Sequence, residues 1–94
     1  MIRVLIERRL IERVDTFAHE ALRELRHEAI KKPGYISGET LRDVDDPNHY
    51  IVISSWQSRR DWETWYKSEE RSRADEQFRA VLTEPEKITV FEMA

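Results

Sequence analysis

The stretch YIVISSWQSRRDWETWY, residues 50–66, decides the fold because it predicts a strand followed at once by a short aromatic helix. Its first part, Tyr50 to Trp56, is rich in the β-branched residues that favour strands. Ser58, followed three residues later by Asp61, resembles the start of a helix, although this pattern prefers Glu or Gln at the later position. One face of the predicted helix carries three aromatic residues, Trp62, Trp65 and Tyr66.

Upstream of this stretch, the sequence predicts a strand and a helix. Ile2, Val4 and Ile6 alternate with their neighbours in the period of a strand. Pro33 and Gly34 end the helix that follows, because proline disfavours helical geometry just before it. Apolar residues at three- and four-residue spacing mark one face of that helix: Val14, Phe17, Ala18, Ala21, Leu22, Leu25 and Ala29.

The remaining elements are a second strand, another helix and a last strand. Residues 35–44 predict the second strand, and the turn DDPNH, residues 45–49, joins it to the third as a hairpin. Ser68 is a second helix N-cap, and TEPEK, residues 83–87, breaks the helix that it starts. Residues 87–92 form the last strand. The apolar residues of the last helix are Ala74, Phe78, Val81 and Leu82.

The predicted order is therefore β-α-β-β-α-α-β within one domain, residues 1–94. This order is typical of the ferredoxin-like α+β class, with a four-stranded antiparallel sheet and helices on one face. Apolar residues at both parities of the first and third strands predict that the other face is also partly apolar. We expect a second copy of the chain to cover it, giving a homodimer.

The composition excludes several classes of function. Sixteen basic and nineteen acidic residues are mixed along the chain, for a net charge of −3. Nucleic-acid and anionic-membrane surfaces need clustered Lys and Arg, so neither partner is expected. No apolar run reaches membrane-spanning length, and there is no cysteine for a disulfide or thiolate site. We expect a soluble, cytoplasmic protein.

The segment WQSRRDWETWYKSEERSRADEQF, residues 56–78, resembles the antibiotic biosynthesis monooxygenase family. PGYISGE, residues 33–39, and a last strand after a proline match the family as well. The resemblance implies a dimeric α+β barrel. It also implies an oxygenase that acts on quinol- or polyketide-like aromatics without metal or flavin, so no cofactor is expected. Other members of the family degrade haem, and many have no assigned activity.

The resemblance also suggests where chemistry would lie. Trp65, nine residues after Trp56, matches a Trp of the haem-degrading members, whereas many small-molecule members have His there. By an ungapped count, the Asn and axial His of the haem enzymes correspond to Glu7 and Asp75. A carboxylate is a poor replacement for imidazole on haem iron, so we expect no haem degradation.

Four residues form the expected site. Trp65 and Tyr66 would bind substrate as wall and hydrogen-bond donor, with Glu7 or Asp75 as the general base. A base near neutral pH needs a raised pKa, and a solvated or salt-bridged carboxylate is the alternative for each. Aromatic stripes on helices usually face the core, which is the alternative for the aromatic pair and the expectation for Trp62.

The histidines and serines predict no further site. The three histidines do not form the i, i+4 pair of a helical metal site and are expected at the surface.

Two interpretations of function compete. One is a cofactor-independent monooxygenase of a small electron-rich aromatic, and the other is a non-catalytic dimer that binds a small hydrophobic or aromatic ligand.

Overall fold

The computed structural model describes residues 1–12 and 16–94 of the chain, without the side chains of residues 16–18. Val14, in the apolar stripe predicted for the first helix, lies outside the described residues. The side chains of Phe17 and Ala18 lie outside them as well.

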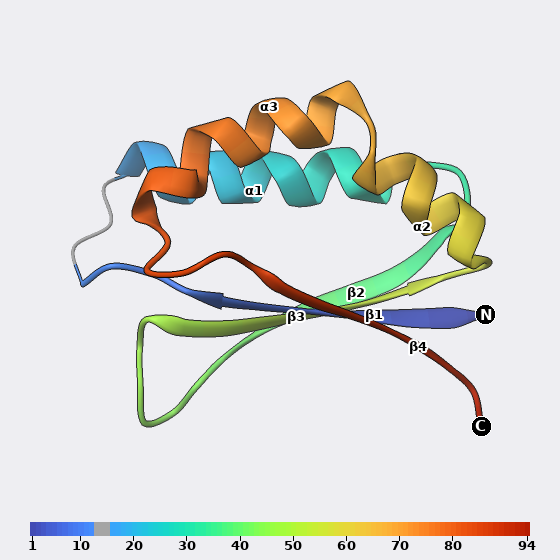
Figure 1. Ribbon diagram of the computed structural model, residues 1–94, viewed down its shortest axis with the longest axis horizontal. Helices are drawn as coiled ribbons and strands as arrows, with labels where there is room; N and C mark the ends of the chain where they lie inside the picture. Colours follow the sequence, from blue (N-terminus) through green and yellow to red (C-terminus); the bar gives the residue numbers. More distant parts are fainter. Residues whose placement is uncertain (13–15) are drawn as a thin grey trace.

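Four strands and three α-helices make up the described chain (Figure 1). In chain order, the elements are β1 (Ile2–Arg9), α1 (Thr16–Ile30), β2 (Tyr35–Arg42), β3 (His49–Trp56), α2 (Arg59–Tyr66), α3 (Glu69–Phe78), a 3₁₀ turn (Arg79–Val81) and β4 (Lys87–Glu92). The predicted order of elements is confirmed.

The strands form one antiparallel sheet in the order β2-β3-β1-β4. All three helices lie on one face of this sheet, and α3 runs alongside α1 (Figure 1). The ferredoxin-like α+β fold predicted from the sequence is therefore the fold observed.

Strand β1 shows why this face of the sheet is the core. Its inward positions, from Ile2 through Val4 and Ile6, are buried, in the period-two alternation of a strand. Trp56 on β3 and Phe78 on α3 are among the most deeply buried side chains, and both belong to the same cluster. The core thus lies between the sheet and the helices.

Local hydrogen bonds fix where the short helix α2 begins. The Asp61 amide donates to Ser58 Oγ at 3.1 Å, and Ser58 Oγ donates to a carboxylate oxygen of Asp61 at 2.9 Å. Gly34, which ends the segment after α1 at φ +86°, packs so closely on Asp61 that a Cβ there would overlap its carboxylate. The predicted cap is confirmed, and it anchors α2 against the end of α1.

Besides the start of β3, three boundaries differ from the predicted ones. β1 continues to Arg9 because the inward side chain of Arg8 is paired with Glu86. β2 ends at Arg42 because the Asp43 carboxylate accepts the Asp45 amide at 2.8 Å, and this bond starts the turn. The last helix leaves α-geometry at Phe78 and continues as a 3₁₀ turn.

The sheet face away from the helices, the outer face, has apolar residues among charged ones. By strand register, Leu5 on β1 lies beside Ile53 on β3, and Leu41 on β2 lies beside Ile51. Phe91 on β4 is exposed at the edge of this face. The partly apolar outer face predicted from the sequence is therefore present.

His49 lies on the same outer face. Its ring nitrogens lie 2.9 Å from carboxylate oxygens of Glu7 and Asp43, and only 12% of its side chain is exposed. The expectation of a surface histidine at this position was wrong, because β3 begins one residue earlier than predicted and includes it.

No helix in the described part of the chain has the length and apolarity needed to cross a membrane.

Candidate active site

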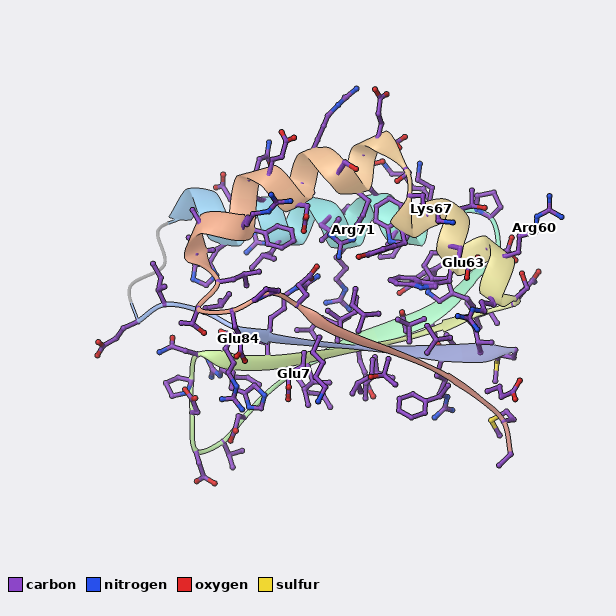
Figure 2. The ribbon with its side chains drawn as sticks, in the orientation of Figure 1. Glu7, Arg60, Glu63, Lys67, Arg71 and Glu84 are labelled. Carbon is purple, nitrogen blue, oxygen red and sulfur yellow. The ribbon has the colours of Figure 1, made fainter. Side chains whose placement is uncertain are left out.

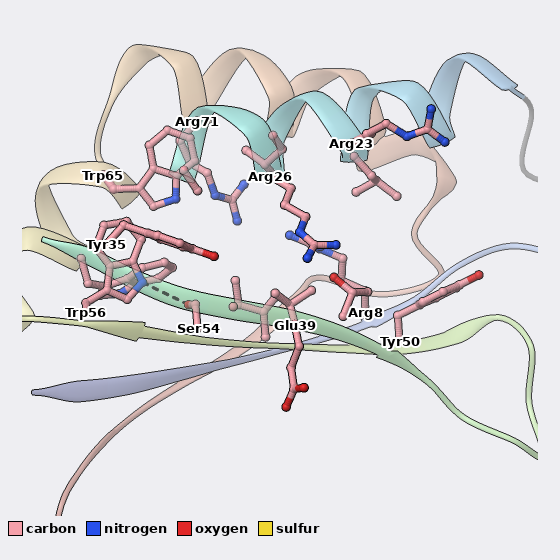
Figure 3. A pocket seen from close by; sticks show the side chains of 18 of the residues that line it. Arg8, Arg23, Arg26, Tyr35, Glu39, Tyr50, Ser54, Trp56, Trp65 and Arg71 are labelled. Atoms are coloured by element: carbon pink, nitrogen blue, oxygen red, sulfur yellow. Dashed lines mark hydrogen bonds between the residues drawn. The ribbon is translucent and has the colours of Figure 1, made fainter. Parts of the chain in front are cut away.

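A cavity of about 270 Å³ lies between the sheet and helix α1, with α2 at one end (Figure 3). Its floor is formed by inward side chains of β1 and β3, such as Ile6 and Val52, and its roof by Leu22, Leu25 and Ala29 of α1. The volume is just below the range for small-molecule sites, about 300–1,000 Å³. A compact ligand would fit this space.

The end of the cavity near α2 is aromatic. Trp56 meets Tyr35 edge-on with ring centroids 5.3 Å apart, and it meets Trp62 in the same way at 5.8 Å. Trp56 Nε1 donates to Ser54 Oγ at 3.0 Å, so its buried polar tip has a partner (Figure 3). These contacts make a rigid wall.

Trp65 completes this wall from α2. Only 3% of the residue is exposed, and Lys32 Nζ lies 5.7 Å from the centroid of its ring. A cation at this distance over an indole face is attracted by the ring quadrupole. Lys32 also pairs with Glu70 at 3.0 Å, which ties the start of α3 to this wall.

Tyr35 places a hydroxyl in the cavity (Figure 3). Burial raises the pKa of Tyr35, and the nearby positive charge of Arg26 partly opposes that change. The phenol therefore stays protonated near neutral pH and can donate a hydrogen bond. Gly38 gives the hydroxyl its room, because a Cβ at that position would overlap it.

The middle of the cavity is strongly basic. Arg8 and Arg71 are both buried and share one carboxylate: Arg8 Nε lies 2.6 Å and Arg71 Nη2 lies 2.7 Å from the two oxygens of Glu86. Figure 2 shows Arg71 reaching from α3 toward the sheet. Burial lowers the pKa of Arg8, while Glu86 opposes this, so the guanidinium remains charged.

The far end of the cavity opens toward solvent beneath α1. Arg23 and Arg26 of α1, both exposed, line this end, and the Arg26 side chain reaches from the helix toward the sheet (Figure 3). His19 and Tyr50 line the same end of the cavity. The cavity thus has an aromatic end and a basic end.

The four predicted site residues do not share this cavity, although two of them, Tyr66 and Asp75, line a separate hollow beside the segment that leads into β4. Trp65 lines the cavity, and so does Trp62, which was expected only to pack. Tyr66 is 46% exposed and stacks on the outer side of Trp62 at 5.5 Å, so it does not line this cavity. The reason is geometric, since successive helix residues point about 100° apart and Trp65 takes the inward direction.

The two predicted bases also lie elsewhere. Glu7 is on the outer face, paired with His49, because it has the opposite strand parity to Ile6 (Figure 2). Asp75 pairs with Arg71 at 3.4 Å and with Arg79 at 3.0 Å, and it does not line the cavity. Neither carboxylate reaches a ligand bound there.

Glu39 lies on β2 at the edge of the cavity, but its carboxylate points across the sheet toward the outer face (Figure 3). Within residues 1–12 and 16–94, no three His, Asp or Glu side chains gather in a way that could hold a metal ion.

Several residues of the cavity were not anticipated, although signals for them exist. Arg8 continues the inward parity of β1, and Tyr35 belongs to the PGYISGE segment. Arg71 falls on the buried face of α3 with Ala74 and Phe78, at three- and four-residue spacing. A buried arginine on such a face indicates a partner or a site rather than a solvated surface.

Known proteins with this fold share nearly its whole length. A structure described as an antibiotic biosynthesis monooxygenase is 17% identical, with a TM-score of 0.90 over 100% of this chain and 99% of the other. A conserved protein from Methanosarcina mazei is 14% identical, with a TM-score of 0.90 over 99% and 92% of the two chains. No curated relative matches the chain in sequence.

SnoaB, a cofactor-independent oxygenase from Streptomyces nogalater, is 15% identical, with a TM-score of 0.82 over 99% of this chain and 93% of its own. At such identities, these likenesses establish the fold. The sequence model of the antibiotic biosynthesis monooxygenases matches residues 1–77, most of the chain. This protein therefore belongs to the antibiotic biosynthesis monooxygenase family.

Proposed function

We propose that this protein is a cofactor-independent monooxygenase that oxidises a small, electron-rich aromatic compound in the cavity beneath α1. The observation that carries the proposal is the cavity itself, which is closed at one end by Trp56, Trp62 and Trp65 and has the Tyr35 hydroxyl exposed within it. Family membership and the fold shared with the oxygenase SnoaB support it.

In the proposed reaction the substrate supplies all the electrons. A phenolic or enolic substrate loses a proton, and its anion transfers electrons to O₂. A ring C–H carbon becomes a carbonyl, one oxygen atom enters the product at that carbon, and the other leaves as water with the ring hydrogen and the released proton. The protein would orient the substrate and stabilise its anion in a site from which water is largely excluded.

The cavity's own residues suit these tasks. The three indoles hold a flat ring, and the protonated Tyr35 hydroxyl donates to the developing oxyanion. The positive charges of Arg8 and Arg71 favour the ionised form of the substrate, because an opposite charge nearby lowers the pKa of an acid. His19, at the open end, can pass the released proton to solvent.

Oxygen uptake tests the proposal. Hydroquinones and hydroxynaphthalenes should cause O₂ consumption in the presence of a metal chelator and without added flavin. Tyr35→Phe should lower kcat by roughly 100-fold, the usual effect of removing one oxyanion donor. Gly38→Ala should also lower kcat, because the added Cβ displaces the Tyr35 hydroxyl.

Arg60→Gln is the control, since Arg60 lies exposed on α2 and points away from the cavity (Figure 2). It should keep the rate of the unmodified protein. If O₂ uptake is absent with every substrate, or is unchanged in Tyr35→Phe, the oxygenase proposal is wrong.

The second candidate function is a non-catalytic module that binds a small aromatic ligand. One observation favours it: among the described residues that line the cavity, none presents a carboxylate base to its interior. Saturable binding of an aromatic compound without O₂ consumption would establish this function in place of the first.

We also propose that the protein acts as a homodimer through the outer face. Leu41 and Phe91 are exposed there, beside the half-buried Leu5, Ile51 and Ile53. An apolar face of this kind is usually covered by another surface. A second copy packed on it would leave the cavity of each protomer on the opposite side of its sheet.

A further inference from the structure

We infer that the ligand of the cavity is an aromatic monocarboxylic acid, with its ring at the tryptophan end and its carboxylate at the guanidinium groups of Arg8 and Arg71. This inference deepens the proposed function and rests on it for the aromatic half of the ligand. The carboxylate half rests on the charges of the cavity.

The charge of the cavity is opposite in sign to that of the chain. The protein carries a net charge of −3, yet four arginines line this one space, Arg8, Arg23, Arg26 and Arg71. Among the described lining residues, the only carboxylate is that of Glu39, which points away (Figure 3). A concave site with charges of one sign attracts ligands of the other sign.

The inner arginines are paired with two carboxylates of the described chain, neither of which lines the cavity. Arg8 and Arg71 are both buried, and the two share the single carboxylate of Glu86. The second acidic neighbour, Asp75, lies 3.4 Å from Arg71 and is also paired at 3.0 Å with the exposed Arg79. The two guanidinium groups therefore face a cavity in which no described lining residue presents a carboxylate, and a bound anion would pair with them from that side.

The inner arginines also have free hydrogen-bond donors. Among the described residues, the Arg8 side chain donates only through Nε, to Glu86, and the Arg71 side chain donates through its two Nη atoms. A guanidinium has five N–H donors in a planar fork, which matches the two oxygens of a carboxylate. The Nη groups of Arg8 are therefore available to a ligand.

The outer arginines provide a path for an anion from solvent. Arg23 and Arg26 are three residues apart on α1 and so lie on one side of the helix. Neither forms an ion pair with any residue in the described part of the chain. Their exposed charges would attract an anionic ligand to the open end and orient its acidic group.

The size and the charge of the cavity together restrict the class of ligand that it can bind. The cavity has a volume of about 270 Å³ and is bounded at one end by three indole rings. It therefore accommodates a compact ring system rather than an extended one. Because Glu86 and Asp75 already offset part of the inner positive charge, one carboxylate suits this site better than a dianion. A naphthalene ring with one carboxylate has both properties.

The experiment compares 2-naphthoic acid with 2-naphthamide, which has nearly the same shape but no charge, by isothermal titration calorimetry at pH 7.5. The acid should bind about tenfold or more tightly than the amide, and its advantage should fall as salt is added. Arg26→Gln should weaken binding of the acid by roughly fivefold and leave the amide unchanged. Arg60→Gln should change neither affinity.

Each contrary result has a distinct meaning. Equal affinities for acid and amide would overturn the carboxylate assignment while leaving the aromatic cavity of the proposed function intact. Failure of both compounds to bind would overturn both proposals. An equal loss of acid binding in Arg26→Gln and Arg60→Gln would show attraction by overall surface charge, and the cavity assignment would be wrong.

Discussion

The three aromatic side chains of α2, Trp62, Trp65 and Tyr66, have different structural roles. Trp62 packs between Trp56 and Tyr66, with ring centroids 5.8 Å and 5.5 Å away. Trp65 has Lys32 over its ring and also lines the cavity. The ring of Tyr66 covers Trp62 from the solvent side. The same helix therefore contributes packing and a binding wall from neighbouring positions.

The two tryptophans should respond differently to truncation. Trp62→Ala removes contacts in the closed part of the cluster and should lower the free energy of unfolding by about 3–5 kcal/mol. Trp65→Ala should cost less, because in the described chain Trp65 lacks the two aromatic ring contacts that Trp62 makes, and it should chiefly weaken binding of aromatic ligands. Thermal melts and ligand quenching of tryptophan fluorescence separate the two effects. Equal destabilisation without any ligand quenching would show that the cluster is only core.

The His49 cluster should make stability depend on pH. The carboxylates of Asp43 and Glu7 raise the pKa of His49, and Arg9 partly opposes this. The same contacts lower the pKa of both carboxyl groups. A raised histidine pKa stabilises the fold below pH 6.5, and this effect is lost as pH rises through the raised value. The lowered carboxyl pKa values stabilise it above pH 4.5, and this effect is lost in acid.

Both contributions are therefore complete only between about pH 4.5 and 6.5. We expect the stability difference between the unmodified protein and His49→Gln to be largest in this interval and to shrink on either side. Urea unfolding at a series of pH values and one protein concentration measures it. A difference that is constant from pH 4 to 9 would contradict the prediction.

At the level of elements, the helix-capping and helix-breaking residues in the sequence were sufficient to predict the order of the helices and strands. Ser58, Ser68 and Gly34 act through local bonds and backbone angles, which a sequence displays directly. The strand ends were less accurate, because Arg8 is stabilised by Glu86, 78 residues away. The cavity could not be predicted for the same reason, since it depends on contacts between distant segments.

The cap of α2 offers a test at this scale. Ser58→Ala removes the acceptor for the Asp61 amide and should lower the free energy of unfolding by about 1 kcal/mol. Because α2 carries two cavity tryptophans, the same variant should also weaken aromatic ligand binding. Ser72→Ala, at an exposed position inside α3, is the control and should be neutral or slightly stabilising. Equal effects of the two substitutions in chemical denaturation would mean that the cap contributes nothing.

For the molecule as a whole, the helices cover one face of a sheet that has apolar residues on both. The inner face was predictable from strand alternation, as was the apolar character of the outer face. The positions of Glu7 and Asp75 were not, because an ungapped count along the chain ignores which face a strand residue takes and which arginines surround a helix residue. The strand parity of Glu7 and the ion pairs of Asp75 determine where these two carboxylates lie, and residue type alone does not reveal either.

The outer face predicts a stable dimer. Sedimentation at micromolar concentration should give twice the mass of the chain, with an interface of about 2,000 Å² or more in total. Ile53→Arg places a charge at the middle of this face and should yield monomers. Val44→Arg, in the loop after β2 where the residue is 97% exposed, should leave the dimer intact. A monomeric unmodified protein would contradict the prediction.

The carboxylate shared by Arg8 and Arg71 also has a consequence for how the chain acquires its structure. Glu86 comes after every helix and just before β4, so the two guanidinium groups have no shared counterion until the last segment docks beside β1. A growing chain on the ribosome would lack the carboxylate that pairs with Arg8 until its final residues emerged, which disfavours early closure of the core. Because β1 pairs with both β3 and β4, the sheet is built mainly from non-local contacts, and such topologies fold slowly. Folding should therefore be a late, concerted event, in which the last strand and the charged floor of the cavity form together.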